Sequence, residues 1–201
     1  MKERDFLENK KIALKKLEKA IKENLADEDI IPILDLINHS EDYFTSSSCY
    51  GRTVLLEIPV IGNKKEAKFL GKWHRTVDAS EILDSLKNAK IGQLWILSQS
   101  PIIHITAKTQ IAADKMLKTA IACGFKHSGL KSLEKNIVVE ICSTERLDAP
   151  VGKDGVLFCN KDHLELLVNI SNEIIKKSTL KLQKLEEKIR KDINTYKTTN
   201  E

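Results

Sequence analysis

The last part of the chain carries a long apolar repeat, and this repeat limits the possible folds more than any other feature. From residue 161 to about residue 196, apolar residues return every three or four positions, as they do along one face of a helix. The repeat consists of Leu164, Leu167, Ile174, Leu182, Leu185, Ile189 and Ile193, with Ser171 and Ser178 on the same stripe. We therefore expect a long terminal helix over 161–196 that packs on the rest of the chain. An oligomer that forms through the terminal helices, as in a coiled coil, is the alternative.

The rest of the sequence mixes helical and strand patterns. An amphipathic helix is expected over about 5–25. A second helix is expected from Asp27, as its cap, to Asn38, or from a later start that places Pro32 in the first turn. Helices capped by Asp78 and Thr109 follow, and the second of them ends at Gly124. Short apolar runs bounded by turn residues indicate strands over 53–61, 73–77, 94–97, 102–106, 125–130 and 136–142. We predict an α+β fold in which helices pack on a mixed β-sheet, and a single domain over 1–201, because no linker or repeat interrupts the chain.

Two common nucleotide-binding signatures are missing from the sequence. No Gly-x-Gly-x-x-Gly follows a predicted strand, and no Gly-x-x-x-x-Gly-Lys-Ser/Thr occurs. The predicted α+β fold is therefore non-Rossmann.

The composition is that of an ordinary globular protein, with 31% charged and 41% hydrophobic residues. No apolar run approaches the roughly 20 residues that cross a bilayer. The charged start of the chain does not read as a signal peptide, so we expect a cytoplasmic protein with no membrane partner. The four cysteines form no Cys-x-x-Cys pair and are expected to be free thiols rather than metal ligands. The net charge of +4 is compatible with a polyanionic partner but does not require one.

The most unusual stretch runs from Thr45 to Arg52 and reads Thr-Ser-Ser-Ser-Cys-Tyr-Gly-Arg. Hydroxyls and backbone amides in a tight turn can cradle a phosphate or carboxylate, and glycine lets the backbone approach closely. The guanidinium of Arg52 suits the same anions in bidentate geometry. A plain polar turn between two strands explains the stretch equally well.

Two histidines are candidates for proton transfer. His104 lies inside a strand-like run and faces away from its neighbours Ile103 and Ile105, and His74 follows Trp73. An imidazole can accept a proton near neutral pH, although a lone histidine is more often a hydrogen-bonded structural residue. Neither histidine has a partner at i+4 or a cysteine pair nearby, so we expect no metal site.

Taken together, these segments resemble the family of tRNA wybutosine-synthesizing protein three. The motifs that carry the resemblance are Ser46–Arg52, Gly71–His74, Pro101–Ile105 and Gly124–Leu130, followed by Asn172 in the last helix. They occur in the same order as in the family, over about residues 4 to 185.

The resemblance implies S-adenosylmethionine-dependent methylation of the ring nitrogen N-4 of 4-demethylwyosine, or a derivative of it. The base is nucleotide 37, and the partner is the anticodon region of phenylalanine tRNA. Such a transfer needs alignment of the two reactants and an acceptor for the proton of the nitrogen.

The resemblance also implies roles for individual residues. His104, His74 and Arg52 are the catalytic candidates, and Ser47, Ser48, Cys49 and Gly51 the cofactor-binding candidates. The substrate-binding candidates are Phe125, Lys126, Ser128, Gly129 and Asn172. His104 or His74 would accept the proton or orient the base, Arg52 with the serines would hold the cofactor carboxylate or a tRNA phosphate, and Phe125 would stack on the purine. A non-catalytic RNA-binding module on the same fold is the alternative, because the usual cofactor loop is missing.

Overall fold

The computed structural model describes residues 3–62 and 65–198, and the chain forms two compact units. Unit 1 comprises Met1–Tyr50, Pro101–Thr144 and Thr179–Glu201, and unit 2 comprises Gly51–Ser100 and Glu145–Ser178. The chain crosses between the units after residues 50, 100, 144 and 178. Each unit has its own sheet and its own hydrophobic core. The expectation of a single domain over 1–201 stays a prediction.

Unit 1 is a four-stranded sheet with helices. Its elements are α1 (Glu3–Lys22), the short 3-10 helix η1 (Glu28–Ile30), α2 (Ile31–His39), β1 (Tyr43–Cys49), β5 (Ile102–Ala107), α4 (Gln110–Ala122), β6 (Gly129–Ser132) and β7 (Ile137–Cys142). The strand order is β1-β5-β7-β6, and each neighbouring pair is antiparallel.

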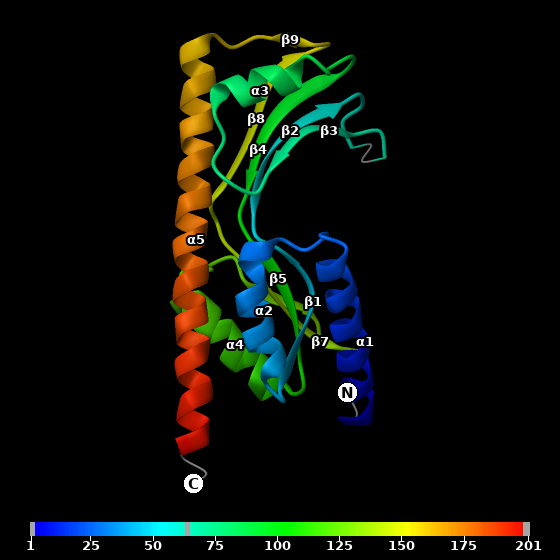
Figure 1. Cartoon of the computed structure of the whole chain (residues 1–201), viewed down its shortest axis with the longest axis vertical. Coiled ribbons are helices and arrows are strands. Elements are labelled where there is room, and N and C mark those ends of the chain that lie inside the picture. The colour runs from blue at the N-terminus through cyan, green and yellow to red at the C-terminus, as the bar shows by residue number, and fades with distance from the viewer. Residues whose placement is uncertain (1–2, 63–64, 199–201) are drawn as a thin grey trace. The chain divides into compact units, whose positions relative to one another are not determined.

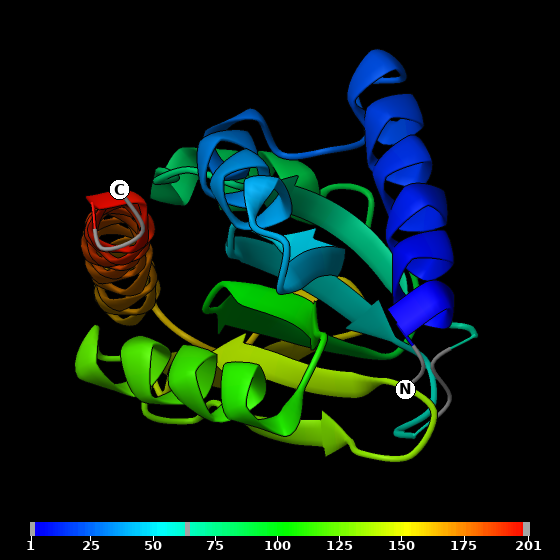
Figure 2. The same cartoon turned by 90° about the horizontal axis from the view of Figure 1, so that it is seen from below.

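The two faces of this sheet have different partners. Ile103, Ile105 and Val139 are fully buried on one face, in a core shared with α2, α4 and the second half of α5. Side chains alternate along a strand, so Phe44 of β1 points to the other face. There its ring centroid lies 5.2 Å from that of Phe6 of α1. Figure 2 shows α1, in blue, apart from α4 and the end of α5.

Unit 2 is built on a five-stranded sheet. Its elements are β2 (Arg52–Ile58), β3 (Lys68–Trp73), α3 (Ala79–Leu86), β4 (Gln93–Gln99), β8 (Arg146–Lys153) and β9 (Val156–Leu157). The strand order is β3-β2-β4-β8-β9, again with antiparallel pairs. Leu55, Leu94 and Ile96 are fully buried in a core with Ile82 of α3 and Leu164 of α5. Figure 1 shows α3 and the first half of α5 on one side of this sheet.

The long terminal helix is confirmed as α5 (Lys161–Thr198). Its apolar stripe is buried, with Leu164 and Leu167 in the core of unit 2 and Leu182, Leu185 and Ile189 in that of unit 1. Because this stripe is buried in the two cores, it is not available to pack against the helix of a second chain in a coiled coil. An oligomer through this helix would have to use its exposed apolar side chains, which include Leu166, Ile170 and Leu180. The side chain of Ile193 lies outside the described residues.

The predicted α+β class is confirmed, and the structure refines its sheets and strands. Two antiparallel sheets replace the single mixed sheet that we expected. The strand expected over 73–77 is wrong, because β3 ends at Trp73, opposite Thr53 near the start of β2. The strand expected from residue 125 begins only at Gly129. Strand β8 was not predicted, because Pro150 and Gly152 disfavour strand structure.

Local signals at the helix ends agree well with the structure. Pro32 lies in the first turn of α2, Asp78 and Glu81 form a capping box on α3, and the Thr109 hydroxyl accepts the Ala112 N–H at 3.1 Å. The first helix is shorter than expected and ends at Lys22. Asn24 ends it with a left-handed backbone (φ 53°), a conformation that asparagine tolerates.

Candidate active site

The polar run in β1 begins at a β-bulge. Thr45 pairs with Ile105 and Ser47 with His104, so Ser46 is the extra residue. The buried side chain of Asn38 fixes the bulge, because its Oδ1 accepts the Thr45 N–H at 2.8 Å and its Nδ2 donates to the Thr45 hydroxyl at 3.0 Å. The bulge places the Ser47 hydroxyl beside the histidine of the neighbouring strand.

A chain of four polar side chains crosses the sheet of unit 1 at this point. The Ser47 Oγ lies 2.7 Å from Nδ1 of His104, and Nε2 of His104 lies 2.7 Å from Oε2 of Glu140. The Lys131 Nζ lies 2.8 Å from the other carboxylate oxygen of Glu140. The residues share one face because His104 is directly opposite both Ser47 and Glu140 in the strand register. Ser47 is exposed, whereas 16% of the Glu140 side chain is exposed.

The electrostatics of this chain keep Glu140 ionised. Burial acts to raise the pKa of Glu140, but hydrogen bonds from Lys131 and His104 outweigh it and hold the pKa below its usual value. An ionised carboxylate only accepts hydrogen bonds, so Nε2 of His104 carries the proton that faces it. In the neutral imidazole, Nδ1 is then an acceptor and faces the Ser47 hydroxyl. This arrangement can take up a proton at Nδ1 and stabilise the resulting imidazolium.

The other predicted catalytic residues lie in unit 2. The Arg52 Nε donates to Oε1 of Gln99 at 3.0 Å, and its guanidinium carbon lies 5.7 Å from the centroid of the Phe69 ring. His74 follows the end of β3 and is half-buried. Gly51 has a φ of 99°, a left-handed conformation that glycine adopts without strain, between β1 and β2. At position 51 the backbone conformation itself therefore favours glycine.

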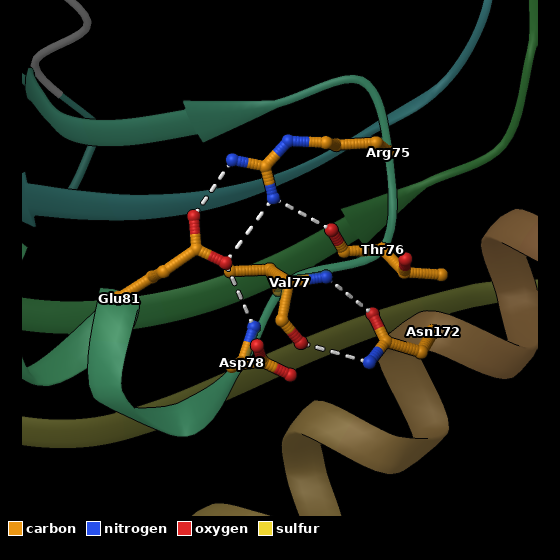
Figure 3. Close-up of polar contacts among 6 residues, drawn as sticks. All are labelled: Arg75, Thr76, Val77, Asp78, Glu81 and Asn172. Atoms are coloured by element: carbon orange, nitrogen blue, oxygen red, sulfur yellow. Dashed lines mark hydrogen bonds and ion pairs between the residues drawn. The ribbon is translucent and has the colours of Figure 1, made fainter.

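Asn172 was predicted to bind substrate. Both the oxygen and the nitrogen of its side-chain amide form hydrogen bonds with the backbone. Its Oδ1 accepts the N–H of Val77 at 2.9 Å, and its Nδ2 donates to the carbonyl of Val77 at 2.8 Å (Figure 3). The amide therefore fastens the segment between β3 and α3 to α5 within unit 2. This geometry is that of a structural clamp.

Next to this clamp, Arg75 and Glu81 form an ion pair at the start of α3. The two Nη atoms of Arg75 donate to the carboxylate of Glu81 at 3.1 and 2.7 Å, and Glu81 accepts the Asp78 N–H at 3.0 Å (Figure 3). The hydrogen bond from Arg75, followed by that from the Asp78 backbone, lowers the pKa of Glu81 to about 2.

Replacing Arg75 with alanine should raise the pKa of Glu81 toward its ordinary value of 4.5. Because the folded-state pKa is depressed, the stability that this ion pair contributes is present above about pH 4.5 and is lost as the pH falls toward 2. That loss should be smaller in the variant. Carboxyl-carbon NMR titration measures the pKa directly, with Lys87→Ala, which removes the partner of Asp84 in the same helix, as the control. A Glu81 that still titrates near 2 in Arg75→Ala would contradict the assignment.

The predicted substrate-binding segment after α4 is mostly structural in unit 1. Phe125 is fully buried in the core, where its ring packs, and its predicted stacking on a base stays a prediction. The Ser128 hydroxyl accepts the N–H of Cys142 at 3.1 Å, and Gly129 pairs with Glu140. Lys126 is exposed. Of this segment, Lys126 is the residue whose charge is open to a ligand.

A cavity of about 620 Å³ in unit 1 contains none of the predicted site residues. Its walls include Ile37, Met116 and Ile189, and its volume lies in the range of small-molecule sites, roughly 300–1,000 Å³. Carboxylates outnumber cations in its lining, which contains Glu41, Asp42 and Asp192 but only one lysine, Lys115. This charge disfavours a ligand with phosphate or carboxylate groups, and we place the site on β1 and β5 instead.

The family follows from comparison with known proteins. The sequence model of the family described as methyltransferase TYW3 matches residues 8–191. The chain belongs to this family. A relative from Pyrococcus horikoshii is 46% identical over 186 residues, which are 92% of this chain and 95% of the relative. It is named tRNA(Phe) 7-((3-amino-3-carboxypropyl)-4-demethylwyosine(37)-N(4))-methyltransferase 1. A relative from Methanocaldococcus jannaschii, with the same enzyme name but without the final number, is 44% identical over 175 residues, which are 86% of this chain and 91% of the relative.

The fold is shared with a solved structure. A Pyrococcus horikoshii protein, titled PH1069, superimposes with a TM-score of 0.90 at 46% identity, covering 93% of this chain and 97% of that chain. Within the described part of this TYW3-family chain, no helix is both long and apolar enough to cross a membrane.

Two residues of the polar chain were missed from the sequence, namely Glu140 and Lys131. The signal for Glu140 was present, because it is the single charge in the apolar run Ile137–Cys142 and alternates with buried Val139 and Ile141. The same alternation had singled out His104. Lys131 lies at a register irregularity between Leu130 and Ser132 in β6, and alternation does not predict its direction.

Proposed function

We propose that this member of the TYW3 family transfers a methyl group from S-adenosylmethionine to N-4 of a 4-demethylwyosine derivative at nucleotide 37 of phenylalanine tRNA. Family membership supports a methyltransferase, and the names of the relatives specify the tRNA and the nitrogen. Those names also specify a base that carries a 3-amino-3-carboxypropyl group, so this derivative is the preferred substrate. Because nucleotide 37 lies beside the anticodon, the proposed partner is the anticodon region of the tRNA, and we expect the enzyme to act in the cytoplasm, where tRNA is found.

The observation that carries this proposal is the chain Ser47–His104–Glu140. As the new N–C bond forms and the methyl–sulfur bond breaks, the attacking N-4 must lose its proton. Nδ1 of His104 takes this proton, directly or through the Ser47 hydroxyl, and Glu140 stabilises the imidazolium through Nε2. The exposure of Ser47 leaves this end of the chain accessible to a base.

The residues on β1 fit the methyl donor. S-Adenosylmethionine, when bound, supplies a methyl group activated by its sulfonium. The exposed hydroxyl of Ser47 or of Ser48, which alternate between the two faces of β1, is a group that binds a carboxylate such as the one at the amino-acid end of the donor, and Cys49 continues the same strand. Of the two roles expected for Arg52, contact with a tRNA phosphate agrees better with its position above Phe69. His74 remains a candidate for orienting the base.

Calorimetric titration with S-adenosylmethionine, with and without phenylalanine tRNA that carries the precursor base, tests the proposal. We expect saturable binding at one site per chain, and transfer of one labelled methyl group per tRNA. Binding of tRNA without binding of S-adenosylmethionine in either titration would instead support the non-catalytic RNA-binding module. Light scattering of the same sample tests whether the terminal helices form an oligomer.

A further inference from the structure

The five-stranded sheet of unit 2 has one packed face and one face without helices. Leu55, Leu94 and Ile96 point into the core beside α3 and α5, so the residues between them on β2 and β4 point the other way. Among the described elements of unit 2, the helices are α3 and the first half of α5, and both lie on the packed side (Figure 1). We call the opposite side the open face and define it by Arg52, Phe69, Lys72, Trp95, Arg146 and Lys153.

The strand register gathers positive charge on the open face. Arg52 and Arg146 flank Gln99 from the two neighbouring strands, Lys72 pairs with Val54, and Lys153 pairs with Gln93. Lys72, Arg146 and Lys153 are exposed. The acidic side chain on this face of the described strands is that of Asp148, which is paired with Arg146. Four cations and one carboxylate give the face a net charge of +3, a strong excess for one face of a small sheet.

The same face carries aromatic rings among its cations. The Phe69 side chain is 58% exposed, and the Arg52 guanidinium lies over its ring. Trp95 of β4 is half-buried in the same row of the sheet, with Leu56 of β2 between it and Phe69, and its indole N–H donates to Gln93 at 3.2 Å. Exposed rings that alternate with cations on an open antiparallel sheet suit nucleotides, because bases stack on the rings while cations hold the phosphates.

We propose that the open face binds the RNA substrate, with unpaired bases of the tRNA stacked on Phe69 and Trp95 and phosphates held by Arg52, Lys72, Arg146 and Lys153. The inference rests on the proposed function, since it names the surface that would hold the tRNA whose base is methylated. An acidic protein segment would satisfy the charge but not the exposed rings. RNA satisfies both.

The charged part of the face is tested by the salt dependence of tRNA binding. We expect the triple variant Lys72→Ala/Arg146→Ala/Lys153→Ala to lower the slope of log K against log salt by about 2, and to weaken binding on the order of 100-fold at 0.1 M salt. The matched control is Lys87→Ala/Lys161→Ala/Lys177→Ala, which removes the exposed C-cap lysine of α3 and two exposed lysines of α5 with the same change in net charge. An equal loss in both variants would overturn the inference, because it would show a general charge effect.

The aromatic part is tested by Phe69→Ala. We expect tRNA binding to weaken by about 5- to 150-fold with an unchanged salt slope, and Phe69→Trp to bind like the wild type. Leu166→Ala is the control, because Leu166 is an apolar side chain, 55% exposed, on α5 at the packed side of the same unit. Circular dichroism and S-adenosylmethionine titration of each variant confirm that the fold is intact.

The outcomes separate this inference from the proposed function. If the wild type methylates the tRNA and the open-face variants bind tRNA as tightly as the wild type, the open face is refuted as the RNA surface. The proposed function would still stand in that case. A wild type that binds tRNA through this face but transfers no methyl group would support the inference and refute the proposed function.

Discussion

Replacing His104 with alanine should slow methyl transfer to the precursor tRNA by about 10²- to 10⁴-fold, the usual contribution of a positioned general base. The change removes the proton acceptor that lies 2.7 Å from both Ser47 and Glu140. Turnover with labelled S-adenosylmethionine measures the effect, and binding of donor and tRNA should change little. Imidazole added to the solution should restore part of the rate, because it can enter the space left by the side chain.

Three further variants sharpen this test. Glu140→Gln should lower kcat with little change in KM, because the amide no longer stabilises a positively charged His104. Ser47→Ala tests whether the proton passes through the hydroxyl. His127→Gln is the control, since His127 is exposed in the same unit and has no place in the polar chain. A His104→Ala enzyme that turns over at the wild-type rate would remove His104 from the mechanism.

Replacing Phe125 with alanine should destabilise the protein by about 3–5 kcal/mol, the typical cost of deleting a buried phenylalanine ring. The side chain is fully buried in the core of unit 1, where α4, α5 and the sheet meet. Urea denaturation followed by circular dichroism measures the change. The activity of the folded fraction at low temperature should stay close to that of the wild type.

Two variants separate packing from substrate binding at this position. Phe158→Ala, at a ring that is 75% exposed, should change the free energy of unfolding by no more than about 0.5 kcal/mol. Phe125→Leu keeps most of the buried volume and should recover much of the stability. If Phe125→Leu instead folded normally but lost tRNA methylation, the ring would have the stacking role that the resemblance implies.

Local structure was the most predictable part of this protein. The caps at Asp78 and Thr109, the position of Pro32 and the glycine at residue 124 depend on backbone groups within a few residues, so the sequence carries them directly. The stripe of α5 was equally clear, because a buried helix face repeats along the chain. Strand β8 was missed because the bulge between Leu94 and Trp95 accommodates Pro150 opposite Trp95, and only the partner strand reveals this.

The candidate site was likewise predictable from the sequence only in part. Alternation with buried isoleucines marked His104 as a side chain on the polar face, and the same argument reaches Glu140. The contact between them could not be predicted, because it depends on β5 pairing with β7 in one particular register. The resemblance located Phe125 and Asn172 in important segments. The structure adds that Phe125 is buried and that Asn172 hydrogen-bonds to the backbone of Val77, and their substrate-binding roles stay predictions.

The sequence by itself determined the helix ends, the long terminal helix, the α+β class and the side of each strand on which polar residues lie. All of these depend on neighbours within one or two turns or on a simple repeat. Only the tertiary structure decided which strands are adjacent, and therefore that Ser47, 57 residues from His104, and Glu140, 36 residues from it, meet at one imidazole. The physical reason is that strand order and register follow from burying two separate cores at once, and no local stretch of the chain encodes that choice.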